Sequence, residues 1–315
     1  MQYLKVDYKN LNIAEELCLT IGNFDGIHKG HIAVINKAKF IAMENKLKLG
    51  VLTFEPHPKC FFSDKYNFFR LTNFREKFLI LKSYKVDFLI NIKFNSEFLK
   101  ISADKFILNK LIKELNVSNV ITGFDFVFGN NKKGDVELIK SYSDKTKKFE
   151  YHEVSEIKQK NLEISSSVIR NLLRKGMIIE ANNLLSRNWT ISSVVISGKK
   201  NGRKIGFKTA NLKVNKFCNL AYGVYLVKVQ IPKMFDMKYF YGIANYGVKP
   251  TVKNTNPLLE VHIFDFDKNI YSFRMNVEFI NFIRAEKKFE SLEKLKSQII
   301  KDIEQARNDR LFKNN

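Results

Sequence analysis

The sequence predicts an α/β protein with two domains: a domain built on a parallel sheet, then a small antiparallel β-barrel with a terminal helix. Strand-like and helix-like segments alternate through the first half, which is typical of a parallel sheet flanked by helices. After Trp189, strand-like runs follow one another without helices between them, as in a small barrel. The length of 315 residues suits two domains of roughly 100–200 residues each.

The elements of the first half follow from hydrophobic periodicity. Short apolar runs such as LCLTIG predict buried strands, and apolar residues at helical spacing between Ile32 and Ala42 predict a helix. Ser102 with Asp104 marks the start of another helix. We expect strands at 17–22, 48–54, 87–94, 118–122 and 149–154, and helices at 30–46, 73–84, 102–115, 135–144, 166–175 and 178–186.

The second half reads as strands separated by turn signals, with one long helix at 291–309. This change of pattern places the domain boundary near residue 185, which gives domains of residues 1–185 and 186–315. The expected strands are 190–197, 223–231, 238–246, 258–266 and 270–280.

The composition is that of a folded protein, but the charge is unusual. Lys and Arg number 54 against 32 Asp and Glu, a formal charge of +22, which suggests a polyanion partner. The basic residues are spread evenly, however, and only 10 of the 54 are arginine, the residue that reads bases and phosphates by paired contacts. The sequence holds no recognisable nucleic-acid-binding module. We therefore expect no nucleic-acid partner, and keep a nucleic-acid-binding protein only as a remote alternative.

Three cysteines, Cys18, Cys60 and Cys218, are too far apart for a zinc site or a disulfide framework, so we expect reduced thiols in a cytoplasmic protein. The N-terminus lacks the apolar run of a signal peptide, and no segment reaches the roughly 18 apolar residues of a membrane span. We expect a monomer or weak oligomer with no membrane partner.

The segment GNFDGIHKGH at 22–31 is the sharpest local signal. It follows a predicted strand and opens a predicted helix, where a parallel sheet presents ligands and backbone N–H groups favour an anion. Its glycines allow a tight turn, and His28 and His31 are spaced to face one phosphate group. The alternative is an ordinary turn with two surface histidines, although two of the five histidines of the chain fall in these ten residues.

This segment resembles the HxGH signature of nucleotidyltransferases, as it occurs in the bacterial bifunctional riboflavin kinase/FMN adenylyltransferases. Four further segments of the first half resemble that family in the same order: TFEPHP at 53–58, RLT at 70–72, GFDFVFG at 123–129 and ISSSVIR at 164–170. The resemblance implies a Rossmann-like nucleotidyltransferase domain that transfers AMP from ATP to FMN, giving FAD and pyrophosphate.

The resemblance also implies roles for individual residues. His28 and His31 would bind the ATP phosphates and stabilise charge on the α-phosphate. By itself, ISSSVIR could equally be a serine-capped helix start. The family pattern assigns ATP binding to Gly22, Phe24, Gly30, Ser165, Ser166 and Arg170, and the flavin pocket to Asn23, Asp25, His57, Asp125 and Phe128.

The second half resembles the riboflavin kinase domain of the same family. GRKIGFKTAN at 202–211 resembles the segment GRxxGxPTAN, and later segments, at 223–229, 244–252, 258–266 and 282–289, follow in order. The resemblance implies an ATP- and Mg²⁺-dependent phosphorylation of riboflavin. It assigns ATP to Gly206, Thr209 and Asn211, Mg²⁺ to Thr209 and Asn211, the catalytic base to Glu260 and a flavin contact to Arg284.

The kinase segment departs from the family pattern. Lys208 stands where the family has proline, and Ser197, Lys199 and Lys200 stand where it usually has His, Asp and Gly. Glu260 itself lies in an alternating strand, where a solvent-facing glutamate is the simpler interpretation. Two hypotheses follow: a bifunctional enzyme that makes FMN and FAD, and an enzyme that makes only FAD and carries a degenerate kinase domain.

Overall fold

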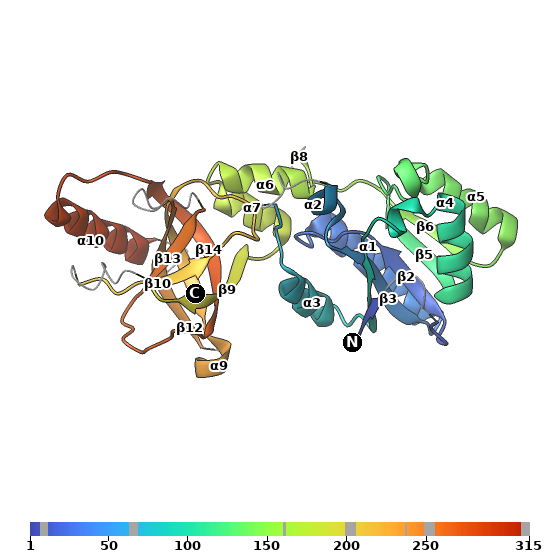
Figure 1. Ribbon diagram of the computed structural model, residues 1–315, viewed down its shortest axis with the longest axis horizontal. Coiled ribbons are helices and arrows are strands. Elements are labelled where there is room, and N and C mark those ends of the chain that lie inside the picture. The colour runs from blue at the N-terminus through green and yellow to red at the C-terminus, as the bar shows by residue number, and fades with distance from the viewer. Residues whose placement is uncertain are drawn as a thin grey trace. The chain divides into compact units, whose positions relative to one another are not determined.

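The computed structural model describes residues 1–6, 12–62, 69–159, 162–198, 206–236, 238–248 and 256–309. The chain forms two compact units (Figure 1), the first made of Met1–Tyr66 with Phe74–Ser166 and the second of Asn67–Asn73 with Ser167–Asn315. The predicted boundary near residue 185 rests on periodicity, whereas the units rest on packing. The two criteria differ over the helices between residues 166 and 185.

The first unit is a six-stranded parallel sheet in the order β1-β4-β3-β2-β5-β6. Its strands are β1 (Gln2–Val6), β2 (Leu17–Ile21), β3 (Lys48–Glu55), β4 (Phe88–Lys93), β5 (Val117–Gly123) and β6 (Glu150–Val154). The helices are α1 (Lys29–Glu44), α2 (Pro58–Phe62), α3 (Phe74–Ser83), α4 (Ala103–Lys105) and α5 (Val136–Thr146), with short 3₁₀ turns at Phe98–Lys100 and Asn130–Lys132. A two-stranded ribbon, β7 (Lys158–Gln159) with β8 (Leu162–Glu163), follows β6.

The path of the chain through this sheet fixes where a ligand is expected. From β2 the chain runs outward to β3 and β4, then returns to β5 and β6 on the other side of β2. The strand order therefore reverses between β2 and β5, and in open sheets of this kind ligands bind at the carboxyl ends of the strands beside such a reversal. The segments 22–31 and 123–129, which the sequence analysis singled out, follow these two strands.

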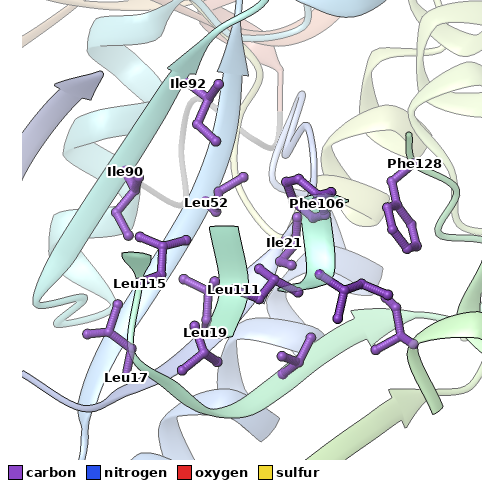
Figure 2. Close-up of a cluster of buried hydrophobic side chains, with 14 of the residues drawn as sticks. Leu17, Leu19, Ile21, Leu52, Ile90, Ile92, Phe106, Leu111, Leu115 and Phe128 are labelled. Carbon is purple, nitrogen blue, oxygen red and sulfur yellow. The ribbon is translucent and has the colours of Figure 1, made fainter. Parts of the chain in front are cut away.

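Apolar layers on both faces explain why the strands read as continuous hydrophobic runs. Leu17, Leu19 and Ile21 of β2 point into one cluster, which also holds Phe106 and Leu111 (Figure 2). Cys18 of the same strand belongs to the opposite cluster, with side chains of α1 such as Ile35 and Ala38. Helical segments therefore cover both faces of the sheet, as the alternating pattern predicts.

Two elements of the first unit differ from the sequence expectation. The helix predicted at 102–115 is α-helical only at Ala103–Lys105 and continues as a π-helix over Phe106–Glu114. The wider winding is seen where Leu115 N donates to Lys110 O, five residues back. Strand β1 was not expected, because its burial pattern is mostly exposed and it pairs only at the edge, with β4.

The second unit contains a closed antiparallel barrel in the order β10-β13-β12-β11-β14-β9. Helices α6 (Ser166–Arg174) and α7 (Ile178–Leu185) precede it, and α10 (Leu292–Asn308) packs on it through residues such as Ile299 and Ile303. The strands are β9 (Thr190–Ile196), β10 (Ala210–Lys213), β11 (Gly223–Gln230), β12 (Tyr239–Gly247), β13 (Leu258–Ile263) and β14 (Arg274–Ala285), with the short helix α9 (Pro232–Phe235) between β11 and β12. The predicted fold class is confirmed, and β10 and the short helix α9 are additions in this unit.

Candidate active sites

The turn after β2, residues 22–28, contains residues in the left-handed region of φ, which is unfavourable for residues other than glycine. Phe24, Gly26 and Ile27 have φ angles of 47°, 86° and 39°. Left-handed φ at a residue other than glycine costs about 1–3 kcal/mol and persists where the surroundings fix it. Phe24 and Ile27 are 1% and 0% exposed, so packing of their side chains fixes this turn.

The two histidines of the segment lie at the first turn of α1. His28 is the N-cap residue, and its Nδ1 accepts a hydrogen bond from the backbone N of His31 at 3.4 Å. The two rings stack, with centroids 3.7 Å apart and planes at 20°. An accepting Nδ1 leaves the proton of a neutral His28 ring on Nε2, which can then donate to an anion. Because His28 is only 6% exposed, it is not one of a pair of surface histidines.

The last motif of the first half lies against the first. Ser166, at the start of α6, donates from Oγ to the backbone O of Asp25 at 2.8 Å, across 141 residues of sequence. A Cβ at Gly30 would lie 3.2 Å from the His28 ring, a tight contact, and 3.5 Å from the backbone O of Ile164. The structure thus brings the segments 22–31 and 164–166 together, with Ser165 half-buried beside them.

Two further candidates are Asn23, in this turn, and His57, after the neighbouring strand β3. The side-chain Oδ1 of Asn23 is buried, and no described residue makes a hydrogen bond to it, so the amide oxygen is available to a ligand. His57 follows β3 and is 5% exposed; its Nδ1 accepts from the backbone N of Lys59 at 3.2 Å, at the start of α2. The imidazole of His57 therefore caps a helix as well as lying beside a strand end.

The loop after β5 carries two candidate flavin residues, one at the surface and one in the core. Asp125 is exposed, whereas Phe128 is 7% exposed and belongs to the core cluster of Figure 2. The Phe128 ring stacks on that of Phe126, with centroids 5.4 Å apart. Gly129 has φ of 74°, and a Cβ there would lie 2.8 Å from the backbone of Ala103, so this loop also requires glycine.

Arg170 belongs to the second compact unit. Its side chain is buried, its guanidinium lies 3.6 Å from the centroid of the Phe69 ring, and its Nε donates to the Phe69 backbone O at 2.8 Å. A planar guanidinium stacked on an aromatic ring is held in one orientation. These contacts hold the segment around residue 69 against α6.

In the barrel, strand register collects the kinase candidates into one row. Asn211 of β10 lies opposite Glu260 of β13, which in turn lies opposite Asn245 of β12. The row continues through Val224 of β11 to Arg284 of β14. Directly opposed residues of antiparallel strands share a face, so these five positions, the Glu260 row, share one face of the barrel.

The next residues along the strands point the other way. Leu212, Leu259 and Val261, which flank Asn211 and Glu260, are buried and pair with apolar neighbours. Glu260 is half-buried, so it is not a freely solvated residue of an alternating strand.

Asn211 suits a cation. It is 5% exposed, and its Oδ1 receives no hydrogen bond from any described residue. A Cβ at Gly198 would lie 2.4 Å from the Asn211 Nδ2, so that glycine leaves room for the amide. Thr209, two residues earlier, offers a second oxygen. Mg²⁺ takes oxygen ligands and is commonly held by few protein groups together with substrate phosphates, so this donor set fits the metal. Among the described residues, no cluster of three His, Cys, Asp or Glu side chains offers a richer site.

A pocket of about 150 Å³ is lined by Thr209, Phe266, Asp267 and Ile270 among others. Lys208, which replaces the proline of the family pattern, forms an ion pair with Asp267. The backbone O of Lys208 lies 2.9 Å from Nδ1 of His262. Gly206 has φ of 89° with open space where a Cβ would stand. The altered loop residues Lys199 and Lys200 lie outside the described residues.

Arg284 forms an ion pair with a residue of the last helix, α10. Its Nε and Nη2 donate to the two carboxylate oxygens of Asp302 at 2.8 and 2.7 Å. Asp302 is 1% exposed and also accepts from Gln298 at 2.8 Å. Paired bonds of this kind fix a guanidinium strongly. The predicted flavin residue thus joins β14 to α10.

Comparison with known proteins decides the family. A family model described as FAD synthetase matches residues 11–168, and one described as riboflavin kinase matches residues 185–309. The bifunctional riboflavin kinase/FMN adenylyltransferase of Haemophilus influenzae is 38% identical over 98% of both chains. The chain belongs to this family. That of Buchnera aphidicola from Schizaphis graminum is 40% identical over 91% of both chains.

A solved structure agrees in fold over the whole length. A chain from Streptococcus pneumoniae, described as a macrolide-efflux protein, superposes with a TM-score of 0.86 and 31% identity, covering 98% of this chain and 99% of that one. No described helix of the present chain is long and apolar enough to cross a membrane.

The sequence analysis did not identify three residues that lie near the two candidate sites: Asn245, Asp302 and Lys77. Asn245 becomes visible only through the register of β12 with β13. Asp302 looks like one of several acidic residues of α10, and Lys77 like one of many surface lysines. For Asp302 and Lys77, periodicity was the available signal, because both fall on the apolar sides of amphipathic helices.

Proposed function

We propose that this chain makes FAD from riboflavin in two steps. The barrel half transfers the γ-phosphoryl group of ATP to riboflavin, which gives FMN and ADP. The α/β half then transfers AMP from a second ATP to FMN, which gives FAD and pyrophosphate. The observation that carries this proposal is the stacked pair His28 and His31 at the start of α1, beside the strand-order reversal, in a chain that matches both family models.

For adenylyl transfer, the reaction needs positioning and charge stabilisation rather than a covalent intermediate. A phosphate oxygen of FMN attacks the α-phosphorus, and the bond to the β-phosphate oxygen breaks. His28, through Nε2–H, and His31 stabilise the added charge on the α-phosphate, with the N-terminus of α1 behind them. The nucleophile is already anionic, so no strong base is needed.

The other candidates of this half are assigned to binding. Phe128, being in the core, would support the flavin pocket rather than line it. We assign the ATP phosphates and ribose to Gly22, Phe24 and Gly30 through their backbone and to Ser165, Ser166 and Arg170, and the flavin to Asn23, Asp25, His57 and Asp125.

In riboflavin phosphorylation, the oxygen of the riboflavin 5′-hydroxyl attacks the γ-phosphorus of ATP, and Glu260 accepts the proton of that hydroxyl. The bond between the γ-phosphorus and the β-phosphate oxygen breaks, which releases ADP. Thr209 and Asn211 would hold Mg²⁺, which would neutralise phosphate charge. Gly206 lets the backbone approach ATP, and Arg284, clamped by Asp302, closes the flavin side of the Glu260 row from a fixed position.

The match to the riboflavin kinase model over residues 185–309 favours an active kinase over a degenerate one. We also propose that the enzyme works in the cytoplasm on small molecules, without a nucleic-acid partner.

The test uses purified full-length protein with ATP and Mg²⁺, and chromatography of the flavins. Riboflavin should give FMN and then FAD, and FMN supplied alone should give FAD. A protein that makes FAD from FMN but no FMN from riboflavin would support the degenerate-kinase alternative. A protein that does neither would contradict the proposal.

A further inference from the structure

A lysine is buried beneath the turn that carries the histidines. Lys77 of α3 is 1% exposed. Its Nζ donates to the backbone O of Asn23 at 2.7 Å and to Oγ1 of Thr53 at 3.2 Å, and lies 3.7 Å from Oε1 of Glu55. Burying an ammonium group is costly unless it is paired and hydrogen-bonded. The three oxygens supply that pairing, and the side chain is locked to them.

These oxygens come from two segments that the sheet places side by side. Asn23 follows β2, and Thr53 and Glu55 end β3, its parallel neighbour. The Thr53 hydroxyl also donates to the Asn23 backbone O, at 3.3 Å. One ammonium and one hydroxyl, both buried, therefore meet on a single carbonyl oxygen.

At that carbonyl a charged group, the Lys77 ammonium, holds the strained turn. The carbonyl belongs to the peptide bond before Phe24, whose φ is 47°. Rotation of this peptide would move the rest of the turn, which ends four residues later at His28. The buried side chains of Phe24 and Ile27 hold the middle of the turn by packing. The hydrogen bonds to Asn23 O fix the orientation of the peptide between Asn23 and Phe24.

We infer that Lys77 is a positioning residue of the adenylyl-transfer site: it holds the Asn23 carbonyl so that the turn presents its N–H groups and His28 in reactive geometry. The inference rests on the proposed function of the α/β half. Lys77 acts through Asn23 and Thr53 and does not touch substrate, because its side chain is enclosed.

Lys77→Met removes the ammonium and keeps the length of the side chain. We expect kcat for FAD formation from FMN to fall roughly 10²-fold, the usual result of a small misplacement of reacting groups. KM for ATP should change much less, because the turn is displaced and not removed. Riboflavin phosphorylation by the same chain should be unchanged, which reports that the barrel half is folded.

A matched control is Lys110→Met. Lys110 is 4% exposed, lies in the π-helix of the same unit and pairs with Glu114. Loss of its pair is expected to lower thermal stability while FAD formation stays near the wild-type rate. An equal loss of FAD formation in both variants would assign Lys77 a merely structural role and overturn the inference.

A second pair keeps the test decisive if Lys77→Met does not fold. Thr53→Val removes the hydroxyl from the Asn23 carbonyl with little change of shape, and Thr53→Ser restores it. We expect slower FAD formation in the valine variant and recovery in the serine variant. Equal rates in both, or wild-type kcat in Lys77→Met, would overturn the inference. If the wild-type protein makes no FAD from FMN, the proposed function itself fails.

Discussion

The two candidate sites differ in which groups form them, backbone in one and side chains in the other. In the α/β half, the backbone makes the site: a strained turn after β2, a helix N-terminus and carbonyl groups held by Ser166 and Lys77. In the barrel half, side chains make the site: Asn211, Glu260 and Arg284 stand in one row across paired strands.

This difference determines how each site should respond to change. A row on paired strands keeps its geometry when one side chain is replaced, since the ladder of backbone hydrogen bonds holds the strands. A turn depends on buried neighbours, so substitutions well away from the phosphates also disturb it. We therefore expect clean single-residue effects in the barrel and wider sensitivity around the turn.

The largest effect is expected from Glu260→Gln, which keeps the shape and removes the base. Riboflavin phosphorylation should fall by up to roughly 10⁴-fold, the upper range for loss of a general base, while FAD formation from FMN persists. The measurement is FMN produced from riboflavin. Glu278→Gln is the matched control, because Glu278 lies on β14 of the same barrel and accepts from Asn188 at 3.1 Å. Full activity in Glu260→Gln would make Glu260 an ordinary strand residue.

His31→Ala should lower adenylyl transfer roughly 10²–10³-fold, the usual cost of removing one group that stabilises transition-state charge. Riboflavin phosphorylation should be unaffected. Rates of FAD formation from FMN and of FMN formation from riboflavin, measured on the same preparation, check both statements. A variant that loses both activities would indicate either a folding defect or a wrong assignment of the two reactions to separate units.

A smaller effect is expected at Lys208. Its ion pair with Asp267 joins side chains that are 54% and 82% exposed, and such pairs contribute about 1 kcal/mol or less. Lys208→Pro, the residue of the family pattern, should change the rate of riboflavin phosphorylation by less than roughly fivefold. Lys208→Ala separates the loss of charge from the effect of the ring. Kinase activity that emerges only in the proline variant would favour a degenerate wild-type kinase.

The smallest effect concerns the cysteines of the α/β half. Burial raises the pKa of Cys18 to about 12, and its Sγ donates to the Ala38 backbone O, so at pH 8 the thiol stays protonated and unreactive. Cys60, half-buried beside His57, should be alkylated first, and FMN should slow that labelling. Mass spectrometry after iodoacetamide treatment measures both. Labelling of Cys18 as fast as Cys60 would contradict the described packing.

Sequence patterns predicted most of this fold because both halves have strong periodicity. The buried strands and the barrel strands were expected within a few residues, and the motif segments fall at the ends of β2, β3 and β5. Strand order and register could not be predicted, since they depend on contacts between distant segments. The Glu260 row is therefore a structural finding, although Asn211, Glu260 and Arg284 were each expected individually.

The parts that sequence could not supply share one cause, which is local conformation imposed by tertiary packing. Phe24 and Ile27 adopt φ angles that their own preferences disfavour, and the π-helix replaces an expected α-helix. Lys77 is a residue type usually found at the surface, but its side chain is buried like that of a core residue.

The central claim is that one chain carries two separable reactions. The most direct test supplies riboflavin, ATP and Mg²⁺ to the wild-type protein and to His28→Ala, and follows the flavins by chromatography. The account predicts conversion to FAD by the wild type and accumulation of FMN by His28→Ala. FAD formation at the wild-type rate by His28→Ala, or no FMN from either protein, would contradict it.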